Sequence, residues 1–154
     1  ISNLPGRFEE IELGVILDGA HNPGKIRFLI RWIRNSQQLT VNSQLTLVIA
    51  FKKGKSWKKM VDLLFKKFPI KRVIATKFYA ATDMGKYQAV EPEEIAKYVK
   101  TVYRLQSTVY SNSQEAVFEA LQLTVNSQLS TVLVTGSLYV VGEVRTMWKL
   151  SSFA

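Results

Sequence analysis

Short apolar runs alternate along this chain with segments in which apolar residues recur at the helical period. The runs hold few polar residues, which predicts strands buried on both faces, as in a parallel sheet covered by helices. The sequence therefore predicts an α/β fold. The expected strands are 11–17, 45–51, 72–76, 107–110 and 131–135, and the expected helices are 25–34, 56–68, 92–104, 114–123 and 138–150.

Length and composition narrow the class of protein. One domain is the natural expectation for 154 residues. No apolar run approaches the ~20 residues of a membrane-spanning helix, so we expect no membrane anchor. The chain has no cysteine, which excludes disulfides and fits the cytoplasm. It begins without Met and without a signal-peptide pattern, which suggests an excised domain.

An eight-residue repeat, QLTVNSQL, occurs at 38–45 and again at 122–129. Nothing else in the chain repeats with it, so the sequence is no solenoid or duplicated domain. We interpret 35–45 and 124–130 as low-complexity loop insertions. Both lie between a helix and a strand, away from the carboxyl ends of the strands, and we expect no catalytic role for them.

The stretch VILDGAHNPG, residues 15–24, holds the chain's one histidine. Asp18 follows an apolar strand, and Asn22 and Pro23 have the pattern of a helix N-cap followed by proline at the first helical position. Ligands of open parallel sheets bind beyond the carboxyl ends of the strands, where helix N-termini attract anions. Asp18 and His21 are therefore candidate site residues, although ordinary turn and cap roles explain the same pattern.

A second turn of this kind lies at Gly136 and Ser137, between an expected strand and an expected helix. Ser137 occupies the N-cap position, so this helix would also direct free N–H groups toward the same edge of the sheet. Arg7, upstream of the first strand, offers a guanidinium suited to phosphate. A plain strand-to-helix turn and a solvated arginine are the structural alternatives.

Several common sites are not supported. KKGKSW, residues 52–57, has isoleucine at 49 where a P-loop needs its first glycine, and no G-x-G-x-x-G spacing occurs. One histidine without cysteine makes a zinc site improbable. Asp18, His21 and Ser137 do not form a hydrolase triad, because the serine lacks a nucleophile-elbow sequence.

Three motifs in order resemble one known family. PGRFE, ILDGAHNP and VTGSLYVVGEVR, between Pro5 and Arg145, resemble the C-terminal domain of folylpolyglutamate synthase/dihydrofolate synthase, in the Mur ligase superfamily. The resemblance implies a three-layer Rossmann-like domain over 8–154, with about five to six mostly parallel strands and helices on both faces. It also implies that 1–7 is the end of an interdomain linker, and that an N-terminal ATPase domain is absent from this chain.

The same resemblance implies an ATP- and Mg²⁺-dependent ligase of folate biosynthesis. Such enzymes join L-glutamate to dihydropteroate or folate through an acyl phosphate. The implied catalytic residues are Asp18 and His21, and the implied nucleotide-binding residues are Arg7, Asp18, His21, Asn22 and Ser137. The metal ligands and P-loop belong to the N-terminal domain of the family, so we expect no metal ligand in this chain and no turnover by it alone.

Two other functions stay open at this point. The chain is a free-standing nucleotide- or anion-binding module if no ATPase domain accompanies it. The formal charge of +9, much of it between Lys52 and Arg72, suggests a nucleic-acid-binding domain. We do not expect nucleic acid as a partner, because a solvated helix face explains that charge. The sequence KKGKSWKK also departs from the acidic patch of many bacterial members of the family.

Overall fold

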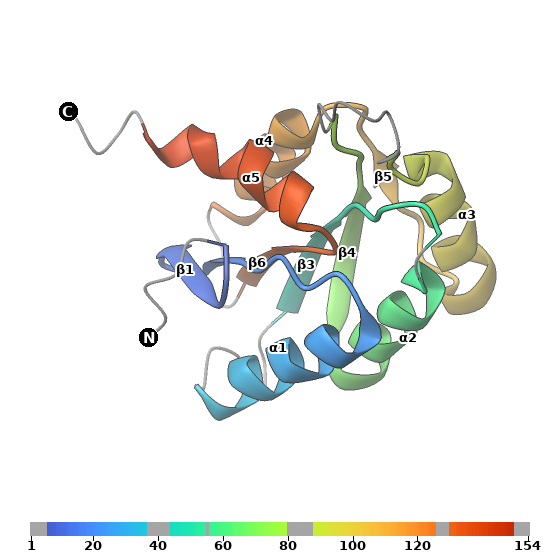
Figure 1. The fold of residues 1–154 in the computed structure, drawn as a ribbon, viewed down its shortest axis with the longest axis horizontal. Helices are drawn as coiled ribbons and strands as arrows, with labels where there is room; N and C mark the ends of the chain where they lie inside the picture. Colours follow the sequence, from blue (N-terminus) through green and yellow to red (C-terminus); the bar gives the residue numbers. More distant parts are fainter. Residues whose placement is uncertain (1–5, 37–43, 55, 80–87, 126–129, 150–154) are drawn as a thin grey trace.

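The computed structural model describes residues 6–36, 44–54, 56–79, 88–125 and 130–149. Six strands form one sheet in the order β1-β2-β6-β3-β4-β5, and five helices pack around it (Figure 1). The strands are β1 (Glu9–Glu12), β2 (Val15–Leu17), β3 (Gln44–Ile49), β4 (Ile70–Ala75), β5 (Thr108–Val109) and β6 (Ser130–Thr135). The helices are α1 (Pro23–Asn35), α2 (Trp57–Lys67), α3 (Pro92–Tyr103), α4 (Ser113–Thr124) and α5 (Leu138–Lys149).

β1 pairs antiparallel with β2, and every other pair of neighbouring strands is parallel. Leu17 pairs with Val134, and Ile49 pairs with both Thr135 and Ala75. The carboxyl ends of β2, β6, β3 and β4 therefore meet at one edge of the sheet. The turns that leave these strands lie together there, as the sequence predicts.

The helices cover both faces of the sheet. Alternate strand residues point to opposite faces, so Leu47 of β3 packs with α1, α2 and α3, whereas Val48 packs with α4 and α5. Both layers of side chains are buried. The predicted three-layer α/β fold with a mostly parallel sheet is thus confirmed. No helix in the described ranges is long and apolar enough to cross a membrane.

The prediction of one continuous strand over 11–17 is wrong. The segment is an antiparallel hairpin, β1 and β2, joined at Leu13 and Gly14. Gly14 has a φ of +80°, a left-handed conformation that glycine adopts without steric cost. Leu13 is 96% exposed at the tip of this hairpin. The apolar residues Ile11 and Leu13 precede Gly14 and those of β2 follow it, so the apolar pattern alone does not reveal the break.

The other expected boundaries need smaller corrections. Each helix begins and ends within two residues of its predicted limits. The strand expected at 107–110 is reduced to Thr108 and Val109. The expected insertions 35–45 and 124–130 overlap neighbouring elements at their ends: α1 includes Asn35, β3 begins at Gln44, α4 includes Thr124 and β6 begins at Ser130. Residues 37–43 and 126–129 lie outside the described ranges.

Gly136 connects β6 to α5 in a tightly packed turn. Its φ is +111°, and a Cβ atom there would collide with the carbonyl oxygen of Ala50 and the ring of Phe51. Gly142, within α5, has a backbone conformation that any residue adopts, and a Cβ added there would point into open space. The two glycines therefore differ in what they contribute to folding.

We predict opposite effects for alanine at these positions. Gly136→Ala should lower the free energy of unfolding by about 3 kcal/mol or more, through strain and a clash with backbone. Gly142→Ala should raise it by roughly 0.5–1 kcal/mol, because alanine favours a helix. Urea unfolding measures both changes. Equal stability of the two variants would contradict the turn geometry.

Candidate anion-binding site

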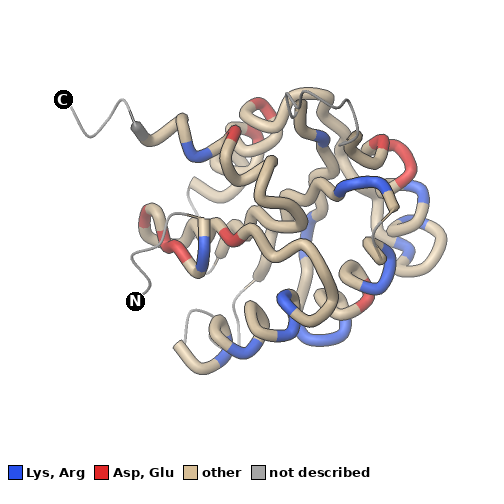
Figure 2. The backbone as a smooth tube through the Cα atoms, in the orientation of Figure 1, with Lys and Arg blue, Asp and Glu red and all other residues tan. Residues whose placement is uncertain are grey.

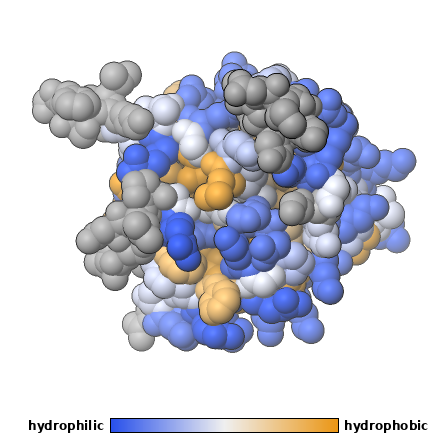
Figure 3. Space-filling model, viewed as in Figure 1, coloured by the Kyte–Doolittle hydropathy of each residue, from blue (hydrophilic) through white to orange (hydrophobic). Residues whose placement is uncertain are grey.

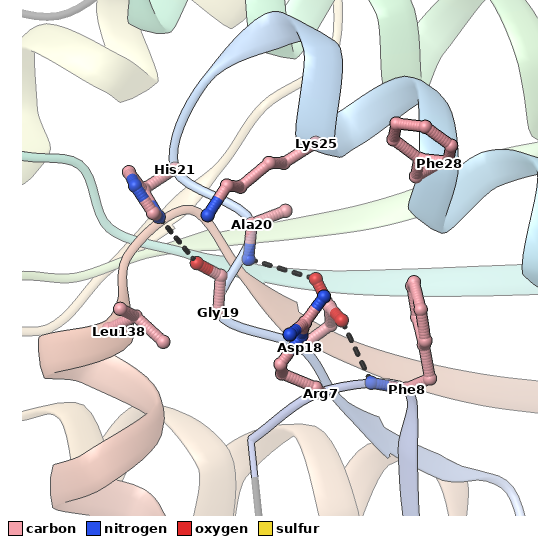
Figure 4. A pocket seen from close by; sticks show the side chains of 9 residues that line it. All are labelled: Arg7, Phe8, Asp18, Gly19, Ala20, His21, Lys25, Phe28 and Leu138. Carbon is pink, nitrogen blue, oxygen red and sulfur yellow. Dashed lines mark hydrogen bonds between the residues drawn. The ribbon is translucent and has the colours of Figure 1, made fainter. Parts of the chain in front are cut away.

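A cavity of about 370 Å³ opens where β2 ends (Figure 4). This volume lies in the range of small-molecule sites, roughly 300–1,000 Å³. The segment before β1, the turn after β2, the start of α1 and the start of α5 form its walls, and hydrophobic patches surround this region between α1 and α5 (Figure 3). The lining residues are Arg7, Phe8, Asp18, Gly19, Ala20, His21, Lys25, Phe28 and Leu138.

Asp18 lies at the base of the cavity and is 4% exposed. Its Oδ2 accepts a hydrogen bond from the backbone N–H of Phe8 at 2.8 Å, and its Oδ1 accepts one from that of Ala20 at 2.8 Å. Burial raises the pKa of this carboxyl group, although the two N–H donors and the charges of Arg7 and Lys25 act in the opposite direction. Asp18 therefore joins the segment before β1 to the turn after β2.

The segment at Gly6, Arg7 and Phe8 is held against the domain by further contacts. The carbonyl oxygen of Gly6 accepts a hydrogen bond from the N–H of Gly19 at 2.7 Å. Phe8 adopts a φ of +49°, which is uncommon for a residue with a side chain, and its ring stacks on Trp32 of α1 at 5.3 Å. These contacts fix the backbone on both sides of Arg7, whose side chain lines the cavity.

His21 is half-buried, and its Nδ1 lies 3.1 Å from the carbonyl oxygen of Gly19. Because a carbonyl oxygen only accepts, Nδ1 carries the proton in this contact. The Nε2 atom is then the remaining polar atom of the ring: it accepts a hydrogen bond in neutral imidazole and donates one in the charged form.

The start of α1 adds a second cation to the cavity. The Asn22 side chain accepts a hydrogen bond from the N–H of Lys25 at 2.8 Å, as an N-cap should, and Pro23 occupies the first turn. The Lys25 side chain extends toward His21 and Asp18 in Figure 4. The helix terminus thus presents its positive end beside an ammonium group.

The start of α5 closes the cavity on the opposite side. Ser137 is buried, and its Oγ accepts a hydrogen bond from the N–H of Tyr139 at 3.0 Å, so its hydroxyl caps the helix. The neighbouring Leu138 lines the cavity instead. Its contact with Gly19 leaves no space for a Cβ at that glycine. The two turns that the sequence predicts, after β2 and after β6, are therefore in contact at Gly19 and Leu138.

The charges suit an anion better than a metal ion. Arg7, Lys25 and His21 surround one buried carboxylate, and both oxygens of that carboxylate already accept backbone hydrogen bonds. Within the described part of the chain, no group of three or more His, Cys, Asp or Glu residues could hold a metal ion. The cavity can bind phosphate groups through cations and a helix terminus.

Three of the predicted site residues, Arg7, Asp18 and His21, line this cavity. Asn22 and Ser137 are not among its lining residues, and their side chains cap α1 and α5. Sequence analysis missed five lining side chains: Phe8, Ala20, Lys25, Phe28 and Leu138. The helical spacing of Lys25 and Phe28 places them on one face of α1, and this signal was available once Asn22 was taken as the cap.

Comparisons with known proteins identify relatives over nearly the whole chain. A family model described as "Dihydrofolate synthetase, C-terminal domain" matches residues 5–147. Dihydrofolate synthetase of Saccharomyces cerevisiae is 30% identical over 141 residues, which are 90% of this chain and 32% of that protein. A probable dihydrofolate synthetase of Schizosaccharomyces pombe is 31% identical over 153 residues, which are 97% of this chain and 35% of that protein.

Solved structures share the fold. Folylpolyglutamate synthase of Mycobacterium tuberculosis, complexed with ADP and AMPPCP, superposes with a TM-score of 0.75 at 21% identity, over 96% of this chain and 33% of that one. The bifunctional folylpolyglutamate synthase/dihydrofolate synthase of Yersinia pestis, complexed with AMPPNP and Mn, superposes with a TM-score of 0.72 at 19% identity. The match covers 97% of this chain and 32% of that one. This chain therefore spans about a third of the length of these relatives.

We predict a specific pH dependence from the buried Asp18. Its pKa is raised in the folded chain, so the folded state binds the proton more tightly than the unfolded state. The stability that this group adds is greatest at low pH and is lost as the pH rises from about 4 through the raised pKa. The measurement is the free energy of unfolding from pH 3.5 to 7.

Asp18→Asn is the reference variant, because asparagine does not titrate. The stability of the wild type minus that of Asp18→Asn should fall as the pH rises and then become constant. A difference that increases with pH would mean that hydrogen bonds and nearby cations outweigh burial, contrary to this description of the site.

Proposed function

This chain belongs to the dihydrofolate synthetase C-terminal domain family, and from that membership we propose that it is part of an ATP-dependent ligase. The proposed reaction joins L-glutamate to dihydropteroate or to a reduced folate, since the relatives include both dihydrofolate synthetases and a probable folylpolyglutamate synthase. The observation that carries the proposal is the cavity at the end of β2, where Arg7, His21 and Lys25 meet the start of α1.

In the proposed reaction the pteroate or folate carboxylate takes the γ-phosphoryl group of ATP and ADP is released. The amino group of glutamate then attacks the acyl phosphate, and the amide forms as inorganic phosphate and a proton leave. Both steps place negative charge on phosphate oxygens. Fixed cations and N–H donors stabilise such charge without reorganising, which is the main protein contribution to phosphoryl transfer. Arg7 and Lys25 supply the cations in this proposal, and the charged form of His21 donates a hydrogen bond from Nε2–H to a phosphate oxygen.

Asp18 has a positioning role in this proposal. Its hydrogen bond to the N–H of Phe8 keeps Arg7 at the cavity, and its hydrogen bond to Ala20 shapes the turn that carries His21. The remaining lone pairs of its carboxylate can also accept a hydrogen bond from a ribose hydroxyl. Asn22 and Ser137 contribute by fixing the two helix termini beside the nucleotide.

The divalent ion of the reaction, Mg²⁺ in our proposal, binds elsewhere. As the family resemblance implies, we assign its ligands and a phosphate-binding P-loop to the part of the relatives that this chain does not match. This chain alone should then bind nucleotide weakly and show no turnover.

The proposal is tested in the full-length protein with dihydropteroate and tetrahydrofolate as parallel substrates. Arg7→Gln and His21→Ala should each lower kcat/KM for ATP by roughly 100-fold, the loss typical of a removed phosphate or oxyanion donor. ATP-dependent ligation of glutamate is the readout. Thermal unfolding of both variants should stay within a few degrees of the wild type, because neither side chain is part of the core.

Lys97→Gln on α3 is the matched control, since Lys97 is exposed and does not line the cavity. It should leave kcat/KM unchanged. Wild-type ligation by Arg7→Gln and His21→Ala would remove the site assignment. If the full-length wild type binds nucleotide but ligates glutamate to neither substrate, the ligase proposal is wrong and the protein is a nucleotide-binding module.

A further inference from the structure

Positive charge concentrates on α1 and α2. The two helices together carry eight of the chain's 21 Lys and Arg residues, whereas one of its 12 acidic residues, Asp62, lies on them. Figure 2 shows these basic residues along both helices. Asp62 accepts hydrogen bonds from the hydroxyls of Tyr98 and Tyr103 on α3, so it is engaged on the side of α2 that packs against α3.

A groove of about 720 Å³ lies between the two helices and collects five of these cations. No acidic residue of the described ranges lines it. Ile30 and Leu63 are its apolar lining residues, and all of its Arg and Lys residues are exposed. We call this the α1–α2 groove; its described lining is Arg27, Ile30, Arg31, Arg34, Asn35, Leu63, Lys66 and Lys67.

Helix termini explain only part of this charge. Arg34, Lys66 and Lys67 lie in last turns, where cations stabilise the helix. Arg27 and Arg31 lie within α1, four residues apart, where like charges destabilise a helix by about 0.2–0.5 kcal/mol. An anion bound in the groove would relieve this repulsion.

We propose that the α1–α2 groove binds a small anion carrying several phosphate groups. Guanidinium groups bind phosphate through paired N–H donors, and five cations can neutralise the four or five charges of a linear polyphosphate. The volume also lies in the range of small-molecule sites.

The aromatic residues near the groove favour a small anion over a nucleic-acid strand. Single strands are held by bases stacking on free aromatic faces. Trp32 instead stacks on Phe8, and Phe65 stacks on Tyr103. The exposed ring of Phe28 lies under the guanidinium of Arg31 and lines the cavity at the end of β2. No aromatic side chain of the described ranges lines the groove. The groove therefore offers contacts for phosphate groups but no platform for bases.

This site is separate from the cavity at the end of β2. The two share no lining residue, although both use α1. The proposal therefore does not depend on the ligase function. It needs a test in which the cavity cannot bind phosphate.

The test uses inorganic tripolyphosphate with an Arg7→Gln/Lys25→Gln form of the chain, which disables the cavity. Titration calorimetry at constant ionic strength should detect one bound tripolyphosphate. Adding Arg31→Gln and Lys66→Gln should weaken that binding at least about 10-fold, because two charge-assisted contacts are lost. Glutamine maintains helices, and thermal unfolding should verify that the variant is folded.

Lys97→Gln/Lys100→Gln, which removes two exposed charges from α3, is the matched control and should change the affinity less than about twofold. Equal weakening by both pairs would show a general charge effect and overturn the proposal. A single-stranded 20-nucleotide DNA that binds through Arg31 and Lys66, when tripolyphosphate does not, would also overturn it and identify a nucleic-acid surface. Absence of any binding would overturn it as well.

Discussion

The site depends on one buried carboxylate. Asp18 accepts two backbone hydrogen bonds, from Phe8 and from Ala20, and these join segments that are separate in the sequence. Removing a carboxylate from water is costly, and the raised pKa of Asp18 shows that the hydrogen bonds compensate that cost only in part. Through these two hydrogen bonds Asp18 holds the segments that carry Arg7 and His21 at the same cavity.

The parallel sheet supplies the frame for that carboxylate. The ends of β2 and β6 are adjacent, so the turn at Gly19 meets the start of α5 at Leu138. A paired contact between Arg145 of α5 and Glu9 of β1, at 3.0 and 3.1 Å, fastens the antiparallel edge strand to the same helix. Contacts among β1, β2, α1 and α5 thus determine the shape of the cavity, while the rest of the sheet supports them.

Sequence reasoning succeeded where local patterns decide the structure. Apolar periodicity predicted the alternation of strands and helices, and the Asn22-Pro23 pair predicted the start of α1. It failed at the hairpin, where Gly14 reverses the chain within residues 11–17, which we expected to form one strand. The prediction that Ser137 occupies an N-cap position is confirmed, since its hydroxyl caps α5. Phe8 and Leu138 reach the cavity through long-range packing, which no local pattern specifies.

The central claim is that the turn from β2 into α1 holds phosphate groups. A two-dimensional NMR titration of this chain with millimolar ATP tests it most directly, because each backbone amide reports its own surroundings. The account predicts that the amides of Gly19, Ala20, His21 and Lys25 shift and that their changes saturate together. Unchanged resonances at these four residues, with ATP bound elsewhere or not at all, would contradict it.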